Sequence, residues 1–247
     1  MTEVKNGMQV ALQHLESADA VIRKSLIWIK QQCATTKGVS NEKLDAHQMA
    51  SFDLAWCAAE STAARFAVDY AGKVVAAGAA GAGACLEERM ALVFCAEALQ
   101  NIHHRLWARP QSFGLKEADV AALASSSLSY YCQTQLDAGN LEALGRQVIA
   151  LNGASGAYML GDDATMMQDS FRKLATNVVM PLAEEIHRHD RIIPQEILEP
   201  LTEMGCFGLS IPERYGGIQS DDHEDNMGMI VVTEELSRGS LGAAGSL

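Results

Sequence analysis

The sequence lacks the features that mark secreted and membrane-spanning proteins. Its start, MTEVKNGMQVALQHLE, has no basic stretch leading into an apolar one, so no secretory signal is visible. No window approaches the roughly 20 uncharged apolar residues of a membrane span. The six cysteines include no C-x-x-C pair and lie mostly in Ala-rich helical contexts, which indicates buried free thiols in a reducing compartment. We therefore expect a cytoplasmic protein without a membrane span.

Positive charge is scarce, and negative charge is unevenly distributed. The chain of 247 residues holds 19 Lys and Arg against 31 Asp and Glu, a net charge of −12. Residues 1–150 contribute 13 basic and 15 acidic side chains (net −2), and residues 151–247 contribute 6 and 16 (net −10). Because no basic stripe is available to neutralise phosphates, we expect no binding to nucleic acid. The acidic surface favours solubility, with a basic partner as the alternative interpretation.

Signals for β-strands are minimal, and the first 150 residues show helical periodicity instead. One apolar stripe runs from Met8 to Cys33, and another runs from Leu92 to Leu106 and is closed by Pro110. A further helix is predicted from Glu117 to Leu136, broken afterwards by Gly139-Asn140, with a shorter piece following. The remaining stripe consists of Phe52, Trp56, Ala59, Ala63, Phe66, Tyr70 and Val74. Long amphipathic helices with short connections predict a helical bundle.

The composition changes around residues 152–163, where the chain reads NGASGAYMLGDD, and this is the best candidate for a linker. Beyond it we expect a helix over Thr165–His189 that Pro181 kinks, and a short helix over Pro194–Met204 that ends before Gly205. A last helix is expected over Met227–Arg238. The predicted fold class is all-α, with a helical-bundle extension over residues 1–152 and a second helical domain over residues 165–247.

The segment from Phe171 to Leu247 carries an ordered set of motifs. It reads FRKLATNVVMPLAEEIHRHDRIIPQEILEPLTEMGCFGLSIPERYGG, then an acidic spacer, then VTEELSRGSLGAAGSL. This segment resembles the first helical domain of the acyl-CoA dehydrogenases, in which P-x-A-x-E, P-x-E-[IV]-x-x-x-L-x-E-x-G, G-[LF]-x-x-P-E-x-[YF]-G-G and E-E-[LI]-[SA]-R follow one another. The matching residues are Pro181, Ala183, Glu185, Pro194, Glu196, Leu201, Glu203, Gly205, Gly208, Pro212, Glu213, Tyr215, Gly216, Gly217 and Glu234–Arg238.

The resemblance implies an FAD-dependent oxidoreductase that desaturates an acyl-CoA thioester between its α and β carbons. In the family a carboxylate removes the α-proton and a hydride passes from the β-carbon to the flavin. It also implies a homo-oligomer that passes electrons to an electron-transfer flavoprotein. We expect the catalytic base and the flavin-binding segments to lie beyond Leu247, so that the domain over residues 165–247 is incomplete and the chain alone is inactive. No catalytic or flavin-binding residue can be named within it.

The N-terminal extension departs from the common family pattern. Together with EELSRGSLGAAGSL it resembles one branch of the family, the methylsuccinyl-CoA dehydrogenases, whose members convert (2S)-methylsuccinyl-CoA to mesaconyl-CoA. The resemblance places the acyl pocket near Ala244 and just beyond Leu247. Small residues at these positions would leave room for a branched or carboxylated acyl group. The alternative interpretation is that Gly and Ala there permit close helix packing.

Other motifs point to weaker hypotheses. AGKVVAAGAAGAGAC lacks the third Gly of a nucleotide-binding loop and is interpreted as a connection between helices. His187, His189 and Asp190 do not share one helix face, so we predict a polar helix end and no metal site. Neither Ser210 nor any cysteine has a neighbouring His in sequence, which leaves hydrolase chemistry without support. The alternative function is a non-catalytic helical module for interaction or oligomerisation, built on the extension.

Overall fold

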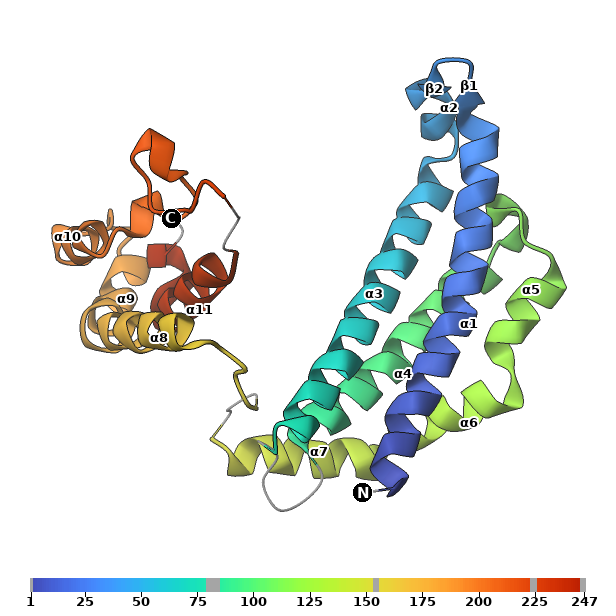
Figure 1. The fold of residues 1–247 in the computed structure, drawn as a ribbon, viewed down its shortest axis with the longest axis horizontal. Coiled ribbons are helices and arrows are strands. Elements are labelled where there is room, and N and C mark those ends of the chain that lie inside the picture. Colours follow the sequence, from blue (N-terminus) through green and yellow to red (C-terminus); the bar gives the residue numbers. More distant parts are fainter. Residues whose placement is uncertain (1, 79–84, 153–155, 223–225, 245–247) are drawn as a thin grey trace. The chain divides into compact units, whose positions relative to one another are not determined.

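The computed structural model describes residues 2–78, 85–152, 156–222 and 226–244 (Figure 1). The chain divides into two compact units, Met1–Tyr158 (unit 1) and Met159–Leu247 (unit 2). Both units are helical, which confirms the predicted all-α class. The strands among the described residues are β1 (Ala34–Thr35) and β2 (Gly38–Val39), which pair antiparallel in a small hairpin. No described helix is long and apolar enough to cross a membrane.

Unit 1 is dominated by three long helices. Its elements besides the hairpin are α1 (Thr2–Cys33), α2 (Asn41–Ala46), α3 (Gln48–Ala76), α4 (Leu86–Trp107), the 3-10 turn η1 (Pro110–Phe113), α5 (Glu117–Ala121), the 3-10 turn η2 (Ala122–Ala124), α6 (Ser126–Gln135) and α7 (Ala138–Ala150). Helix α3 packs against both α1 and α4, and α6 covers another side of α4 (Figure 1). The core of the unit lies between these four helices.

The apolar stripes on α1 and α4 face this core as predicted. Leu15, Ile22 and Ile29 of α1 are buried, although Leu26 of the same stripe is 46% exposed. On α4 the whole predicted stripe is buried, and the helix ends at Trp107, before Pro110. The predicted periodicity of these two helices is therefore confirmed. Its physical reason is that large aliphatic side chains gain the most free energy from leaving water, so the face that carries them is buried.

The stripe predicted for α3 was wrong. Of its seven residues only Val74 is buried, while Phe52 is 62% and Phe66 is 68% exposed. The buried face of α3 consists of Ala50, Asp53, Leu54, Cys57, Ser61, Ala64, Val68, Ala71 and Val74. Small side chains on this face allow α1 and α4 to approach α3 closely, and close packing of many small groups outweighs the burial of a few aromatic rings.

The helix predicted from Glu117 to Leu136 was also wrong, because a side-chain cap divides it. The Ser125 Oγ accepts a hydrogen bond from the Leu128 backbone N at 3.3 Å and starts α6 as a separate helix. The Asp137 carboxylate caps α7 in the same way, accepting from the Gly139 backbone N at 2.9 Å. Gly139-Asn140 therefore lies in the first turn of a helix and does not break one.

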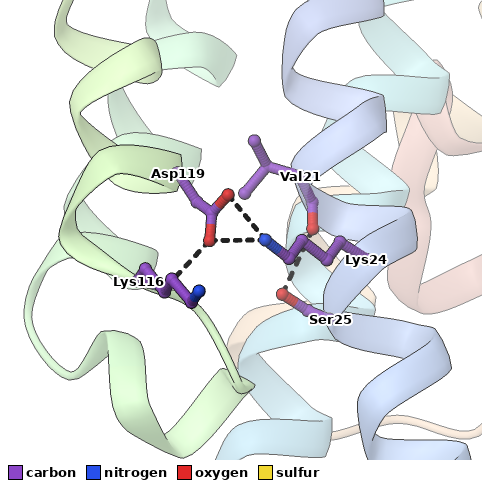
Figure 2. Close-up of polar contacts among 5 residues, drawn as sticks. All are labelled: Val21, Lys24, Ser25, Lys116 and Asp119. Atoms are coloured by element: carbon purple, nitrogen blue, oxygen red, sulfur yellow. Dashed lines mark hydrogen bonds and ion pairs between the residues drawn. The ribbon is translucent and has the colours of Figure 1, made fainter.

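Polar contacts join the elements of unit 1 at defined points. The Lys24 Nζ of α1 lies 2.7 Å from both carboxylate oxygens of Asp119 on α5, and Asp119 also accepts from the Lys116 backbone N at 2.8 Å (Figure 2). The Ser61 Oγ of α3 donates to the Asp19 carboxylate of α1 at 2.5 Å. These contacts set which residues of neighbouring helices lie side by side.

Unit 2 is built from shorter elements. They are α8 (Asp162–Leu174), the π-helical turn η3 (Ala175–Val179), α9 (Met180–Arg188), α10 (Gln195–Glu203), the 3-10 turns η4 (Cys206–Gly208) and η5 (Glu213–Tyr215), and α11 (Asn226–Ala244). Their shared core contains Phe171, Val179, Ile197, Leu201, Val232 and Leu236. Helix α11 packs against α8, η3 and α9.

The irregularity expected at Pro181 takes the form of the π-helical turn η3 directly before it. Proline has no N–H, and its ring would clash with the carbonyl group four residues earlier. A wider π turn relieves this clash without ending the helix. The chain therefore passes from α8 through η3 into α9 as one irregular helix.

The glycine and proline positions of the motif segment form a cap and a turn. Gly205 has a left-handed φ of 71° just after α10, as the sequence predicts for a helix end. A Cβ atom on Gly217 would lie 1.8 Å from the Ile211 carbonyl oxygen, so only glycine fits there. Pro212 and Gln219 then form a parallel bridge that closes the turn.

Candidate functional site

Helix α11 presents two different faces, and the outward one is the candidate site. Val232 and Leu236 lie in the core of unit 2, and Val231 is also buried. The opposite side forms a shallow groove of about 400 Å³, lined by Met229, Ile230, Thr233, Glu234 and Ser237. An open apolar groove with few polar groups can accept another domain or an apolar ligand portion.

A buried ion pair fixes the rotation of α11 about its own axis. The side chain of Glu235 is 2% exposed, and its two carboxylate oxygens accept hydrogen bonds from the Arg172 guanidinium of α8, the Nε contact being 3.1 Å long. The Arg238 Nε lies 3.4 Å from the same carboxylate. Two-point pairing of this kind fixes direction as well as distance. Glu235 therefore positions the groove face and is itself withdrawn from it.

Ser237 adds an unusual polar group beside the groove. Its Oγ is buried and has no hydrogen-bond partner within the described part of the chain. A buried hydroxyl without a partner is costly unless another group completes it.

The end of α11 is bent at Ser240, whose φ of −167° and ψ of 115° are not helical. The Ser240 Oγ accepts a hydrogen bond from the Ala243 backbone N at 3.2 Å, so the last turn starts again with its own cap. Just before the bend, a Cβ atom on Gly239 would lie 3.1 Å from Val179. Gly239 thus lets α11 approach η3 closely.

The predicted pocket residues lie at this end of the chain. Ala244 is the last residue of α11, and Leu247 lies outside the described residues. Their place in an acyl pocket stays a prediction. Ala243 is 2% exposed and packs in the core of unit 2, which at that position agrees with the alternative interpretation that small residues permit close helix packing.

The other candidate groups do not come together as a site. All six cysteines are buried, as predicted, and burial raises the pKa of the Cys57 thiol to about 12 and that of Cys206 to about 11. The His189 Nε2 lies 3.3 Å from the Glu185 carboxylate at the end of α9. No group of three or more His, Cys, Asp or Glu suited to a metal ion occurs among the described residues. Of the glycine-rich run, residues 79–84 lie outside the description, residues 71–76 are the last turns of α3, and Cys85 directly precedes α4.

The groove does not fit a flavin dinucleotide by itself. A pyrophosphate is bound by cationic side chains or by converging backbone N–H groups. The groove is lined by one carboxylate, two hydroxyls and two apolar side chains, and none of these lining groups is cationic. The groove of α11 by itself therefore does not form a cofactor site.

Sequence reasoning missed Arg172. It lies 63 residues before Glu235, and no periodicity or local motif connects the two positions. The one available signal was the acidic pair Glu234-Glu235 on an otherwise apolar helix, because a carboxylate on a buried face requires a partner.

Comparison with known proteins bears on the same region. Residues 161–247 match the family described as acyl-CoA dehydrogenase, N-terminal domain. The chain is 30% identical to a (2S)-methylsuccinyl-CoA dehydrogenase of Cereibacter sphaeroides, over 97% of this chain and 43% of that protein. It is 31% identical to a glutaryl-CoA dehydrogenase of Desulfococcus multivorans, over 34% of this chain and 21% of that protein.

A 3-(aryl)acrylate reductase of Clostridium sporogenes is 33% identical, over 33% of this chain and 21% of that protein. The chain thus spans less than half the length of the curated relatives it matches. The matches to the last two relatives cover about a third of the chain, an extent similar to that of the domain match. The ordered motifs, the helical fold of unit 2 and the domain match agree that residues 161–247 are similar to the N-terminal domain of the acyl-CoA dehydrogenase family.

Proposed function

We propose that the chain is part of a flavin-dependent acyl-CoA dehydrogenase that converts (2S)-methylsuccinyl-CoA to mesaconyl-CoA. The observation that carries the choice of substrate is the extent of the matches. The methylsuccinyl-CoA dehydrogenase matches 97% of the chain, including the extension, whereas the glutaryl-CoA dehydrogenase matches 34%. An extension shared over its whole length favours a shared specialised role over a role common to all family members.

Within this proposal unit 2 contributes a wall of the active site. The Arg172–Glu235 pair holds the groove of α11 outward, where the rest of a full-length enzyme would pack. Ala244 and Leu247 would line the acyl pocket, and the bend at Ser240 lets the last turn leave the direction of α11. Small side chains there would accept the branched carboxylated acyl group. FAD, an electron-transfer flavoprotein and assembly into a homo-oligomer belong to the same proposal.

The direct test uses the protein expressed from its full reading frame. Flavin absorbance is recorded, and mesaconyl-CoA formation from methylsuccinyl-CoA is compared with turnover of butyryl-CoA, using an artificial electron acceptor. A yellow protein that prefers methylsuccinyl-CoA is the expected result. Activity on butyryl-CoA alone would keep the family and reject the substrate. A colourless and inactive protein would favour the non-catalytic interaction module.

A change at Ala244 tests the pocket in the same protein. Replacing Ala244 with Leu should lower kcat/KM for methylsuccinyl-CoA relative to butyryl-CoA by about 10-fold, because extra methyl groups crowd a branched substrate more than a straight one. Gly242→Leu is the matched control, since Gly242 is exposed two residues earlier. Equal losses for both substrates would place Ala244 outside the pocket.

A further inference from the structure

A small cavity lies in unit 1, where α4 is covered by η2 and α6 (Figure 1). Its volume is about 190 Å³, and its lining comes from residues 99–103 of α4 and residues 123–133 of the covering segment. Sites for drug-sized molecules have roughly 300–1,000 Å³, so this cavity suits a smaller molecule. It shares no lining residue with the groove of α11.

The floor of the cavity is apolar. Leu99 of α4, Leu123 of η2 and Leu128 of α6 are each 5% exposed or less. The buried Cys132 thiol completes the floor and donates to the Ala96 carbonyl of α4 at 3.7 Å, which holds α6 against α4. An apolar group of a ligand would leave water on reaching these side chains, and this transfer is favourable.

The rim of the cavity consists of four polar side chains, Gln100 and His103 on α4 and Ser129 and Gln133 on α6. The members of each pair are three or four residues apart, so they share one face of their helix. None of the four side chains forms a hydrogen bond or ion pair within the part of the chain that the structure describes. A few polar groups with free hydrogen-bonding capacity above an apolar floor are the arrangement by which binding sites orient small ligands.

The cavity carries no charge at neutral pH. Among the described residues that line it, none is Asp, Glu, Lys or Arg. Burial, with a smaller contribution from neighbouring His104, lowers the pKa of the His103 imidazole, and burial raises the pKa of the Cys132 thiol. Both groups are therefore neutral. An ion entering this cavity would lose part of its hydration without meeting an opposite charge, whereas an uncharged polar group would find hydrogen-bond partners.

We propose that this cavity is a binding site for a small uncharged molecule that carries an apolar ring and a carboxamide. The ring would rest on the leucine floor, and the carboxamide would pair with Gln100 and Gln133. A glutamine side chain and a carboxamide each offer a donor and an acceptor, so two such groups can bond reciprocally. The site lies within unit 1, and the proposal does not depend on the proposed enzyme activity.

Three probes of nearly the same shape test the chemical class of the ligand. Benzamide is uncharged, benzoate is an anion and benzamidinium is a cation, and each is titrated into the chain of residues 1–247 at mildly alkaline pH, followed by amide NMR. Benzamide should bind with a Kd on the order of 1 mM. Benzoate and benzamidinium should each bind at least about 10-fold more weakly, because the cavity offers no opposite charge. Equal binding of the three probes, or no binding of benzamide, would overturn the proposal.

An exchange of one rim group tests the place of the site. Gln133→Glu keeps the size of the side chain and replaces its amide with a carboxylate, so the preference should change to benzamidinium, with benzamide bound about 10-fold more weakly than in the wild type. Gln13→Glu is the matched control, because it adds the same charge at an exposed glutamine of α1 outside the cavity and should leave the order of the probes unchanged. Circular dichroism verifies that both variants fold. A Gln133→Glu variant with the wild-type order of probes would place the binding elsewhere and contradict the proposal.

Discussion

Unit 1 contains helices of 32, 29 and 22 residues, whereas the longest helix of unit 2 has 19 residues and its neighbours have 13 or fewer. The long helices meet where the large aliphatic side chains of α1 and α4 pack against a face of α3 that contains many small side chains. The shorter elements of unit 2 pack around a smaller apolar core, and glycine and proline turns and the buried Arg172–Glu235 pair add specific contacts. We therefore expect unit 1 to be destabilised most by substitutions that add volume to its core. We expect unit 2 to be destabilised most by substitutions that remove one of a few specific contacts.

The buried ion pair of unit 2 should give the largest effect. The Glu235 side chain is only 2% exposed, and Arg172→Ala leaves it with Arg238 as its remaining guanidinium partner. Because a buried carboxylate that loses a partner is costly, we expect the free energy of unfolding to fall by about 3 kcal/mol. Arg188→Ala removes an exposed partner of Glu184 and should cost about 0.5 kcal/mol or less. Equal losses in the two variants would contradict the role given to Glu235.

The measurement can separate the two units. The three tryptophans, Trp28, Trp56 and Trp107, all lie in unit 1. Urea unfolding followed by tryptophan fluorescence therefore reports unit 1, while far-UV circular dichroism reports both units. For Arg172→Ala we expect an earlier transition in circular dichroism and an unchanged transition in fluorescence.

Two glycines of unit 1 separate steric crowding from backbone strain. Gly114 and Gly78 share a left-handed φ, of 65° and 66°. A Cβ atom on Gly114 would lie 2.2 Å from the Trp28 ring, whereas none of the described atoms comes within 4 Å of one on Gly78. Gly114→Ala should cost about 3 kcal/mol, and Gly78→Ala about 1 kcal/mol from strain alone. Urea unfolding followed by fluorescence measures both, and similar losses would show that Trp28 moves aside freely.

Two adjacent alanines of α3 test which face of the helix is buried. Ala64 is fully buried and Ala63 is exposed. Ala64→Leu should lower the unfolding free energy by about 2 kcal/mol, because the close contact with α1 and α4 has no room for three more carbon atoms. Ala63→Leu should change it by less than about 0.5 kcal/mol, because the Ala63 side chain is exposed. Thermal unfolding measures the difference, and a reversed order would restore the stripe predicted from sequence.

These contrasts explain what the sequence could and could not predict. On α1 and α4, large aliphatic residues repeat on one face, so periodicity identified the buried side. On α3 the aromatic residues gave the stronger pattern, but the buried face combines Ala, Cys, Ser and Asp53 with only three larger aliphatic residues, Leu54, Val68 and Val74. Packing against two neighbouring helices decides between such faces, and periodicity carries no information about the neighbours.

The motif segment was more predictable because its signals are local. Gly205 ends a helix whatever surrounds it, and the Gly216-Gly217 turn depends on its own backbone. Arg172 could not be found, since its partner is distant in sequence and close only in the folded unit. The helix breaks at Ser125 and Asp137 could have been found, because both are common capping residues directly before a helical pattern.

The contact between Lys24 and Asp119 should give the smallest effect. The Lys24 hydrogen bonds hold the pKa of the Asp119 carboxyl below its usual value of 3.8. A carboxyl whose pKa is lower in the folded than in the unfolded state stabilises the fold above its unfolded pKa, and this contribution is lost as the pH falls through the folded pKa. Asp119→Asn should therefore lower Tm slightly at neutral pH and leave it unchanged once the carboxyl of the wild type is protonated.

The same exposed pair predicts a dependence on salt. Because the Lys24 side chain is 48% exposed, added salt should shrink the difference in Tm between wild type and Asp119→Asn. Glu142→Gln, which removes one partner of the exposed Glu142–Arg146 pair within α7, is the control for removing an exposed carboxylate that joins no two elements. Differential scanning calorimetry at neutral and acidic pH, with low and high salt, measures all four conditions. A Tm difference that persists in acid would mean that the Asp119 side chain stabilises α5 through the Lys116 backbone N, as a neutral cap, and not through its charge.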